Sequence, residues 1–320
     1  MPPRRKIHRS GLTMPINNAR FVNAAWTRGC DGFTLDLEDS VPQAQKAQAR
    51  TLVQQAIRIA AQGGGDVEVR INQSSIQADV EAAVWPGLSS LNMGHTLTAD
   101  QVRLMDACIT RMERERGIRP GSIEIDVSPD SVYATVALEE LVDASPREKS
   151  FGAVGGYDYA LSLGVEMFTG VDAFFYPRGL GSLIARAHAK SFPLTAQVPD
   201  TSGSVSDAEH ASVQASATRK IGGRYASGLH PNVVEPMTRG LTPPPEEVEE
   251  AERVLAFWRE LDDKEQAEGL LDGKVVDRYA AAQATELLEW AVACAEMDAH
   301  KERMVARARA RQAEAPASTC

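Results

Sequence analysis

The sequence predicts an α/β protein, a (β/α)8 TIM barrel followed by a C-terminal helical extension. The length of 320 residues suits one such barrel. Short β-rich runs alternate with helix-like segments, which favours a parallel sheet with helical crossovers. The β-rich runs number eight, the count that a closed barrel needs. An open doubly wound sheet is the alternative architecture.

The elements of the expected barrel follow one another from the N-terminus. The β-rich runs cover residues 10–15, 32–38, 67–72, 89–93, 122–127, 150–156, 192–198 and 225–231. The helix-like segments include residues 19–28, 46–61, 99–115, 131–142 and 182–190. We therefore assign residues 1–240 to the barrel.

The region after the last β-rich run has a different character. Residues 241–261 open with prolines and acidic residues, which suit a loop followed by the first turn of a helix. A glycine-containing loop is expected at 268–277, and one long helix at 280–311. We assign 241–312 to a C-terminal helical extension and 313–320 to a disordered tail.

Composition excludes several classes of protein. The formal net charge of −10 makes nucleic acid an unfavourable partner. No apolar run reaches the roughly 18 residues that a membrane span needs, and the N-terminus lacks the apolar core of a signal peptide. The expected compartment is therefore the cytoplasm. The four cysteines, which form no CxxC pair, predict neither a disulfide framework nor a zinc site.

Polar residues recur where the predicted strands end, and this is the edge at which a parallel barrel places its active site. They are Asp36, Glu38, Asp39, Arg70, Asn72, Asp126, Asp130, Asp158, Asp200 and His230. Converging carboxylates repel one another unless a cation lies between them, and oxygen ligands favour a hard ion such as Mg²⁺. Two isolated histidines, His95 and His188, are expected to be structural.

The chain resembles the citrate lyase β-subunit / malyl-CoA lyase family, within the HpcH/HpaI aldolases, over nearly its whole length. The most specific match is RSGLTMPINNAR…DLEDSVP…K…AR in residues 9–50. Further matches occur, in the family's order, at VRIN (69–72), ASPR (144–147), GGYDYALSLG (155–164), GLHP (228–231), PPPEEVEEAERVL (243–255) and DGKVVD (272–277).

The resemblance implies a Mg²⁺ site with two acidic ligands. Asp158 matches one of them. The other is normally a glutamate upstream, and counting back from the ASPR segment places Asp130 there, with Asp126 as the alternative. Asp130 also stands where it could cap the helix expected at 131–142, so a structural role is the competing interpretation.

Five further residues receive roles from the resemblance. Arg70 matches an arginine that binds the carboxylate or α-oxo acid of the substrate, with an ion pair to Glu38 as the competing interpretation. Glu38 and Asp39 match an acidic pair that supports the metal site. Arg20 is expected to bind the cofactor. Asp277 matches an aspartate that reaches the active site of a neighbouring subunit, with an ordinary helix N-cap as the alternative.

The resemblance implies a metal-dependent carbon–carbon lyase, or aldolase, acting next to a carbonyl on a 3-hydroxyacyl-CoA of the malyl, citramalyl or citryl type. It also implies a homo-oligomer, trimer or hexamer, in which the helical extension packs on a neighbour. Three departures keep alternatives open. The family's Pro-Lys pair is replaced within NMGHTL (92–97), and no lysine precedes GLHP, which favours a free 2-oxo acid without CoA. The aspartate in place of glutamate favours a catalytically silent barrel subunit.

Overall fold

The fold is described from a computed structural model that covers residues 7–152, 156–166, 172–190 and 204–314. The chain divides into two compact units. One, here called the α/β unit, comprises His8–Leu241 and Lys301–Cys320. The other, here called the helical unit, comprises Met1–Ile7 and Thr242–His300.

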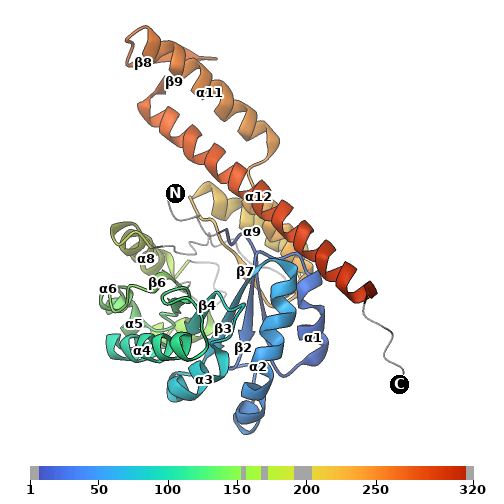
Figure 1. The fold of residues 1–320 in the computed structure, drawn as a ribbon. Helices are drawn as coiled ribbons and strands as arrows, with labels where there is room; N and C mark the ends of the chain where they lie inside the picture. Colours follow the sequence, from blue (N-terminus) through green and yellow to red (C-terminus); the bar gives the residue numbers. More distant parts are fainter. Residues whose placement is uncertain (1–6, 153–155, 167–171, 191–203, 315–320) are drawn as a thin grey trace. The chain divides into compact units, whose positions relative to one another are not determined.

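The α/β unit contains a parallel sheet of seven strands in the order β6-β5-β4-β3-β2-β1-β7 (Figure 1). The strands are β1 (Gly11–Pro15), β2 (Gly32–Asp36), β3 (Asp66–Ile71), β4 (Ser90–Met93), β5 (Glu124–Val127), β6 (Glu148–Phe151) and β7 (Ser227–Gly228). Each overlaps a predicted run, but β6 begins two residues before the run expected at 150–156 and shares only residues 150 and 151 with it. The remaining run, at 192–198, lies outside the described residues. Neighbouring strands follow one another in sequence from β1 to β6, and β7 pairs with the other side of β1. A doubly wound sheet differs, because its strand order reverses partway through the chain.

The strands alternate between an apolar face and a polar face. Leu35, Val69 and Leu91 are fully buried against helices that line the outside of the curled sheet (Figure 1). These helices are α2 (Lys46–Ala60), α3 (Ile76–Ala83) and α4 (Ala99–Glu115), and their apolar sides belong to the same core. The opposite face carries polar side chains, whereas the interior of a barrel is usually filled by branched apolar residues.

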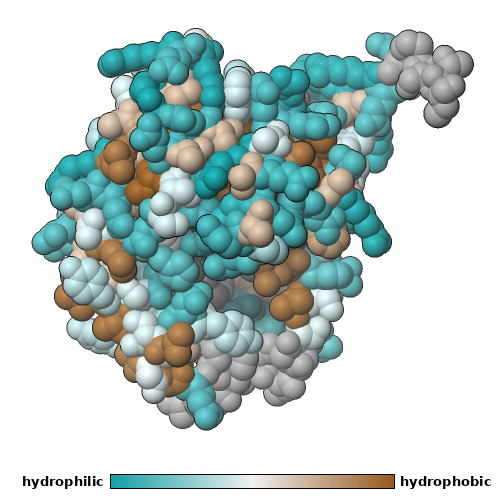
Figure 2. Space-filling view, turned by 90° about the horizontal axis from the view of Figure 1, so that it is seen from below, coloured by the Kyte–Doolittle hydropathy of each residue, from teal (hydrophilic) through white to brown (hydrophobic). Residues whose placement is uncertain are grey.

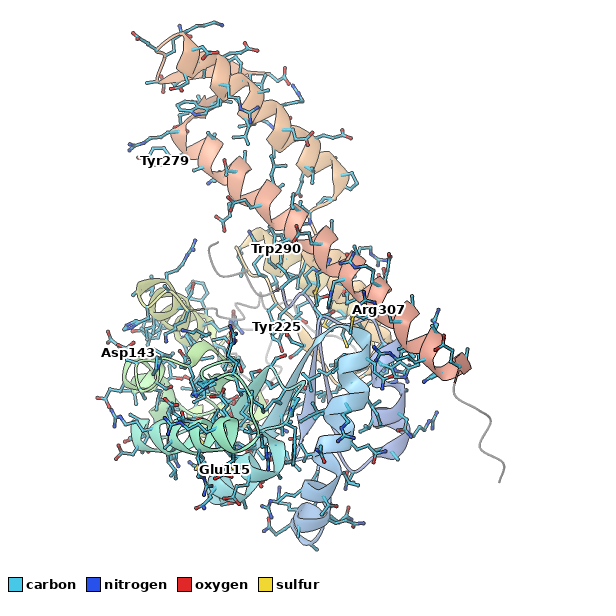
Figure 3. The ribbon with its side chains drawn as sticks, in the orientation of Figure 1. Glu115, Asp143, Tyr225, Tyr279, Trp290 and Arg307 are labelled. Carbon is cyan, nitrogen blue, oxygen red and sulfur yellow. The ribbon has the colours of Figure 1, made fainter. Side chains whose placement is uncertain are left out.

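Shorter elements complete the α/β unit. They are α1 (Ala19–Ala24), η1 (Ala25–Thr27), η2 (Gln43–Gln45), η3 (Ala61–Gly63), η4 (Gln73–Ser75), α5 (Val132–Val136), α6 (Leu138–Val142), α7 (Tyr157–Leu163), α8 (Phe175–Ala187), α9 (Ala208–Lys220), η5 (Pro231–Val233) and α10 (Val234–Leu241). The helix expected at 131–142 is two short helices that meet at Ala137. Tyr225, labelled in Figure 3, lies over Gly11, where a Cβ atom would meet its hydroxyl oxygen at 2.7 Å.

The helical unit consists of α11 (Pro245–Asp263), a hairpin of β8 (Glu268–Leu271) and β9 (Lys274–Asp277), and the first part of α12 (Arg278–Glu314). The loop expected at 268–277 was a wrong prediction, because the hairpin occupies it. Asp272 and Gly273 have φ values of 51° and 80°, as a two-residue type I′ turn requires. In the same unit, Trp290 (Figure 3) packs against Ile7 and Cys294.

The described residues add three points to the sequence analysis. No helix among them combines the length and the apolar character needed to cross a membrane. Cys30, Cys108 and Cys294 are buried free thiols, while Cys320 lies outside the described range. Helix α12 continues to Glu314, so the first two residues assigned to the tail are helical.

Candidate active site

Five polar residues lie at one level across the sheet. The strand register pairs Asp36 with Arg70, Arg70 with Asn92, Asn92 with Asp126, and Asp126 with Ser150. Hydrogen bonds join neighbours within this row: Asn92 Nδ2 donates to Asp126 Oδ1 at 3.2 Å, and Ser150 Oγ donates to Asp126 Oδ2 at 2.9 Å. The row therefore forms a polar floor just below the carboxyl edge of the sheet.

The DLED segment continues from this floor, and the lysine of the K…AR motif holds it in place. Asp36 Oδ1 accepts a hydrogen bond from the Glu38 backbone N–H at 2.8 Å. Lys46 Nζ donates to the carbonyl oxygens of Leu37 and Glu38, both at 2.9 Å, and to Asn72 Oδ1 at 2.5 Å. One ammonium group thus joins the loops that follow β2 and β3.

The arginine of the same motif supports the second of these loops. Arg50 Nε donates to Asp79 Oδ1 at 2.6 Å. The other oxygen of the buried Asp79 accepts from the backbone and side-chain nitrogens of Asn72 at 2.8 and 2.7 Å. The motif that carries the family resemblance is therefore largely a scaffold for the site.

Arg70 stands in the floor among three carboxylates. Its Nε and Nη2 donate to the two oxygens of Asp36, both at 2.8 Å. Its Nη1 donates to Asp39 Oδ2 at 3.3 Å and lies 3.0 Å from Glu38 Oε2. The predicted ion pair with Glu38 is thus present. A guanidinium has five N–H donors, and Arg70 makes three hydrogen bonds to the described residues, so donor capacity remains.

Glu38 is the most perturbed acid of the group. Glu38 is only 7% exposed, and its Oε2 atom accepts no hydrogen bond from the described residues. Burial raises the pKa of Glu38 to about 7, with the Asp39 charge adding to the shift and Arg70 opposing it. A Cβ atom on Gly94 would collide with this carboxylate, so glycine leaves the room that Glu38 occupies. A carboxyl group with this pKa can both hold and release a proton near neutral pH.

His95, which was expected to be structural, lies beside these acids. Its backbone has a left-handed φ of 52°, its N–H donates to Asp130 Oδ2 at 3.0 Å, and its carbonyl accepts from Gln73 Nε2 at 2.8 Å. Its imidazole Nε2 lies 3.8 Å from Glu38 Oε1. His95 comes two residues after β4, so the strand-end criterion that selected the acidic residues could have identified it.

Asp130 lies above the floor, in the loop after β5. It does not cap α5, because the Ser131 hydroxyl accepts the bond from the Ala134 N–H at 3.1 Å. Burial raises the pKa of Asp130, while the hydrogen bond from His95 opposes the rise and the charge of Asp158 adds to it. Asp158 itself is exposed, in the first turn of α7.

The alternative position, Asp126, is less suited to bind a cation. Both of its oxygens already accept hydrogen bonds from Asn92 and Ser150 in the floor. Asp130 has a desolvated carboxylate beside a second acid, an arrangement that a divalent cation would stabilise. The oxygen donors at this edge of the sheet are therefore of the kind that a hard metal ion takes, and Asp130 and Asp158 remain the ligands expected from the resemblance.

The other predicted residues lie elsewhere. Arg20 is exposed in the first turn of α1. Asp200 lies outside the described residues, and His230 Nδ1 accepts the Asn232 N–H at the start of η5. Asp277 belongs to the helical unit, where its Oδ1 accepts the N–H groups of Tyr279 and Ala280, each at 2.9 Å, as an N-cap does.

Curated relatives of similar length support a common ancestry. The chain is 26% identical over 292 residues to the citrate lyase subunit beta of Leuconostoc mesenteroides, covering 89% of this chain and 94% of that protein. It is also 26% identical over 316 residues to an L-malyl-CoA/beta-methylmalyl-CoA lyase of Cereibacter sphaeroides, covering 91% and 96%.

Solved structures show the same fold. CitE from Mycobacterium tuberculosis, in complex with magnesium, acetoacetate and coenzyme A, superposes with a TM-score of 0.66 at 20% identity, covering 89% of this chain and 98% of that chain. A citrate lyase from Burkholderia xenovorans has a TM-score of 0.72 at 16% identity, covering 91% and 95%. The sequence profile of one family matches residues 9–218, more than half of the chain. The chain therefore belongs to the HpcH/HpaI aldolase/citrate lyase family.

Proposed function

We propose that the protein is a Mg²⁺-dependent carbon–carbon lyase that cleaves or forms a bond α to a carbonyl. One observation carries the proposal: a guanidinium with unused donors, Arg70, lies among an excess of carboxylates at the carboxyl edge of the sheet. Such an edge holds the active site of parallel α/β barrels. Family membership gives this geometry its chemical interpretation.

Each residue has a separate task in this proposal. Asp130 and Asp158 hold the Mg²⁺, with Glu38 and Asp39 supporting it. A bound Mg²⁺ stabilises the negative charge that develops on an enolate oxygen. Arg70, held at its Nε side by Asp36, presents Nη1 and Nη2 to a substrate carboxylate and so fixes its orientation.

The preferred substrate is a 3-hydroxyacyl-CoA of the malyl, citramalyl or citryl type. The names of the relatives support it, as does the coenzyme A bound to the CitE structure. A free 2-oxo acid is the second candidate, because the stretch NMGHTL (92–97) stands where the family usually has Pro-Lys, which removes a cation that could pair with a CoA phosphate. Binding to immobilised CoA distinguishes the two candidates.

Proton exchange tests the chemistry without knowledge of the full substrate. Pyruvate and acetyl-CoA are incubated in D₂O with the protein and Mg²⁺, and deuterium at the carbon next to the carbonyl is followed by NMR. We expect exchange that requires the metal and is lost in Arg70→Ala. Absence of exchange with both compounds would identify the third candidate, a catalytically silent barrel subunit.

Calorimetry tests the metal ligands. Asp158→Asn and Asp130→Asn should each weaken Mg²⁺ binding about 10-fold or more, because each removes a charged oxygen ligand. Asp100→Asn is the matched control, since Asp100 is an exposed aspartate on α4 paired with Arg103. Unchanged Mg²⁺ affinity in Asp158→Asn would show that this assignment is wrong.

We also propose that the sheet closes into a (β/α)8 barrel and that the chain forms a homo-oligomer, trimer or hexamer. The pairing of β7 with β1 supports closure. Exposed apolar residues on the α/β unit, such as Val136, Leu161 and Phe175, support subunit contacts, and apolar side chains form separate patches on the face drawn in Figure 2. Arg20, exposed on α1, remains the proposed cofactor-binding residue.

The proposed oligomer places Asp277 in the site of a neighbouring subunit. An inactive Asp277→Asn variant mixed with an inactive Arg70→Ala variant should recover part of the activity. Some interfaces of the mixed oligomer then join a chain with an intact Arg70 to a neighbour with an intact Asp277. Mixed oligomers without recovered activity would leave Asp277 with only its role as the N-cap of α12.

A further inference from the structure

We propose that the C-terminal end of α8 is held by a proton-linked clasp, which is closed near pH 6 and loosens as pH rises. The clasp comprises His188 with its partners Glu139 and Asp143, and Lys190 with its partner Glu148. These residues lie outside the candidate active site, so the proposal can hold or fail whatever activity the protein has.

The end of α8 has a defined backbone geometry. Ala189 has a left-handed φ of 52°, and its N–H donates to the Arg186 carbonyl at 3.4 Å. The Lys190 N–H donates to the Ala185 carbonyl at 2.8 Å. These two bonds make a Schellman motif, which closes the last turn of a helix. The side chains of His188, the C-cap residue, and Lys190 therefore leave the helix from fixed points.

His188 joins this end of α8 to α6, which lies beside it (Figure 1). Its Nδ1 lies 2.8 Å from Oδ1 of Asp143, labelled in Figure 3, and its Nε2 lies 3.2 Å from Glu139 Oε1. An imidazolium ion donates from both ring nitrogens, whereas neutral imidazole donates from only one. Hydrogen bonding to Asp143 and then to Glu139 accordingly raises the pKa of His188 above its ordinary value of 6.5.

A buried ion pair joins the same end of α8 to β6. Lys190 Nζ lies 2.7 Å from Glu148 Oε2 and donates to the Glu148 carbonyl at 2.7 Å. Glu148 is fully buried, and the charged groups around it in the described part of the chain are Lys190, Asp143 and Lys149. Burial raises the pKa of Glu148 to about 7, with the Asp143 charge adding to the shift and the two lysines opposing it.

Apolar burial adds little to the attachment of α8. Its buried residues are Pro177, Gly181 and Ala185, which share one face of the helix and have small side chains. Large side chains such as Phe175 and Leu183 are exposed. Hydrophobic stabilisation scales with the apolar area removed from water, so the polar contacts at the C-terminal end account for a large share of the attachment.

The two proton equilibria act in the same direction. Release of α8 separates His188 from its carboxylates and admits water to Glu148, so both groups have a higher pKa in the attached state. A group of this kind stabilises the attached state at low pH, and that stabilisation is lost as pH rises through its pKa. Above these values His188 loses its second donor and Glu148 becomes a buried anion. The attachment therefore weakens between pH 6 and pH 8.5.

The other end of α8 connects the clasp to the candidate active site. Phe174, the N-cap residue of α8, packs edge-on against Tyr159 of α7, with ring centroids 5.8 Å apart. Tyr159 directly follows Asp158. Loosening of α8 should thus remove support from the segment that carries Asp158, and this consequence alone rests on the proposed function.

Amide hydrogen exchange of the full chain at pH 6 and pH 8.5, followed by mass spectrometry, tests the clasp. Division by the intrinsic exchange rate at each pH gives protection factors for α8 and α4. We expect α8 to be less protected than α4, and the α8 protection factor to fall about 10-fold or more between the two pH values. An α8 protection factor that does not fall, or that equals that of α4 at both pH values, would overturn the proposal.

Variants identify the groups responsible. His188→Gln combined with Glu148→Gln removes both proton equilibria, so the α8 protection factor should then change less than about 3-fold with pH. His8→Gln is the matched control, because His8 pairs with Asp66, at the start of β3, at 2.7 Å, and it should keep the wild-type fall. Circular dichroism establishes folding. His188→Gln alone, at a partly exposed site, should lose part of the fall. Either substituted protein retaining the full wild-type fall would contradict the clasp.

Discussion

Two arginines in the α/β unit, Arg147 and Arg70, lie among carboxylates but differ in how many of their N–H donors are used. Arg147, from the ASPR segment, uses all five N–H donors: Nε bonds Asp106, Nη1 bonds Glu113 and the Ile123 carbonyl, and Nη2 bonds Glu113 and Thr110, at 2.6 to 3.0 Å. Arg70 makes three hydrogen bonds to described residues and shares one nitrogen between two acids.

The pKa values of the glutamates beside the two arginines are shifted in opposite directions. Burial raises the pKa of Glu113, but hydrogen bonds from Arg147 and from the amides of Gly121 and Ile123 outweigh burial, so its pKa is lowered overall. Burial raises the pKa of Glu38 to about 7 because no comparable set of donors reaches it. A fully satisfied cluster stabilises the fold, whereas an unsatisfied one has capacity for a ligand.

The largest expected effect is on stability, from Arg147→Ala. The substitution leaves Glu113 buried without its cation, which should lower the free energy of unfolding by about 3–5 kcal/mol. Chemical denaturation measures it. A loss below about 1 kcal/mol would break the comparison, because Arg147 would then not be the structural member of the pair.

Arg70→Lys should show the complementary result. Lysine keeps the charge but loses the planar fork, so kcat/KM for the oxo acid or acyl-CoA should fall about 100-fold, about 2.7 kcal/mol, mainly through KM. The free energy of unfolding should change by less than about 1 kcal/mol. Arg147→Lys is the control, with reduced stability and near-normal kinetics at low temperature. Unchanged kinetics in a folded Arg70→Lys would exclude the binding role.

The pH dependence of stability sharpens the contrast between the two glutamates. Glu38 has a folded pKa of about 7, above its ordinary value of 4.5, so its folded state binds more protons than the unfolded state between these values. Its contribution therefore lowers stability as pH rises from about 4.5 to about 7.

Removing the charge of Glu38 should remove the fall in stability that Glu38 causes as pH rises. Glu38→Gln should raise the free energy of unfolding at pH 8 by about 1–2 kcal/mol and change it little at pH 4.5. Glu113→Gln should do the reverse and destabilise at pH 8, since the pKa of Glu113 is lowered. Thermal melting at both pH values measures each variant. Equal effects of the two substitutions at pH 8 would contradict the comparison.

The smallest expected effect concerns Asp277. Asp277→Ala should cost about 1 kcal/mol through loss of the α12 N-cap, while Asp277→Asn, which keeps a capping oxygen, should cost a few tenths. If Asp277 also serves a neighbouring site, Asp277→Asn should lose activity while remaining stable. Equal activity of Asp277→Asn and the wild type would restrict the residue to capping.

Local sequence determined the elements of this protein. Alternating residues in β2 and β3, the apolar spacing of α4 and the proline-led start of α11 each depend on a few adjacent residues, so these elements follow from the sequence. The Asp272-Gly273 turn was equally local, and its hairpin could have been predicted from the flanking apolar residues. Family motifs also indicated Arg70, Asp130 and Asp158 as candidates.

Only the tertiary structure decided which candidates meet and which partners each one has. Arg70 and Asp36 are 34 residues apart in sequence, as are Asn92 and Asp126, and the strand register sets them side by side. The same packing gives the Arg147 side chain five hydrogen bonds to four residues, brings His95 Nε2 to 3.8 Å from Glu38 Oε1 and makes Ser131 rather than Asp130 the cap of α5. Burial and charge at a site are sums over residues distant in sequence, so no local pattern contains them.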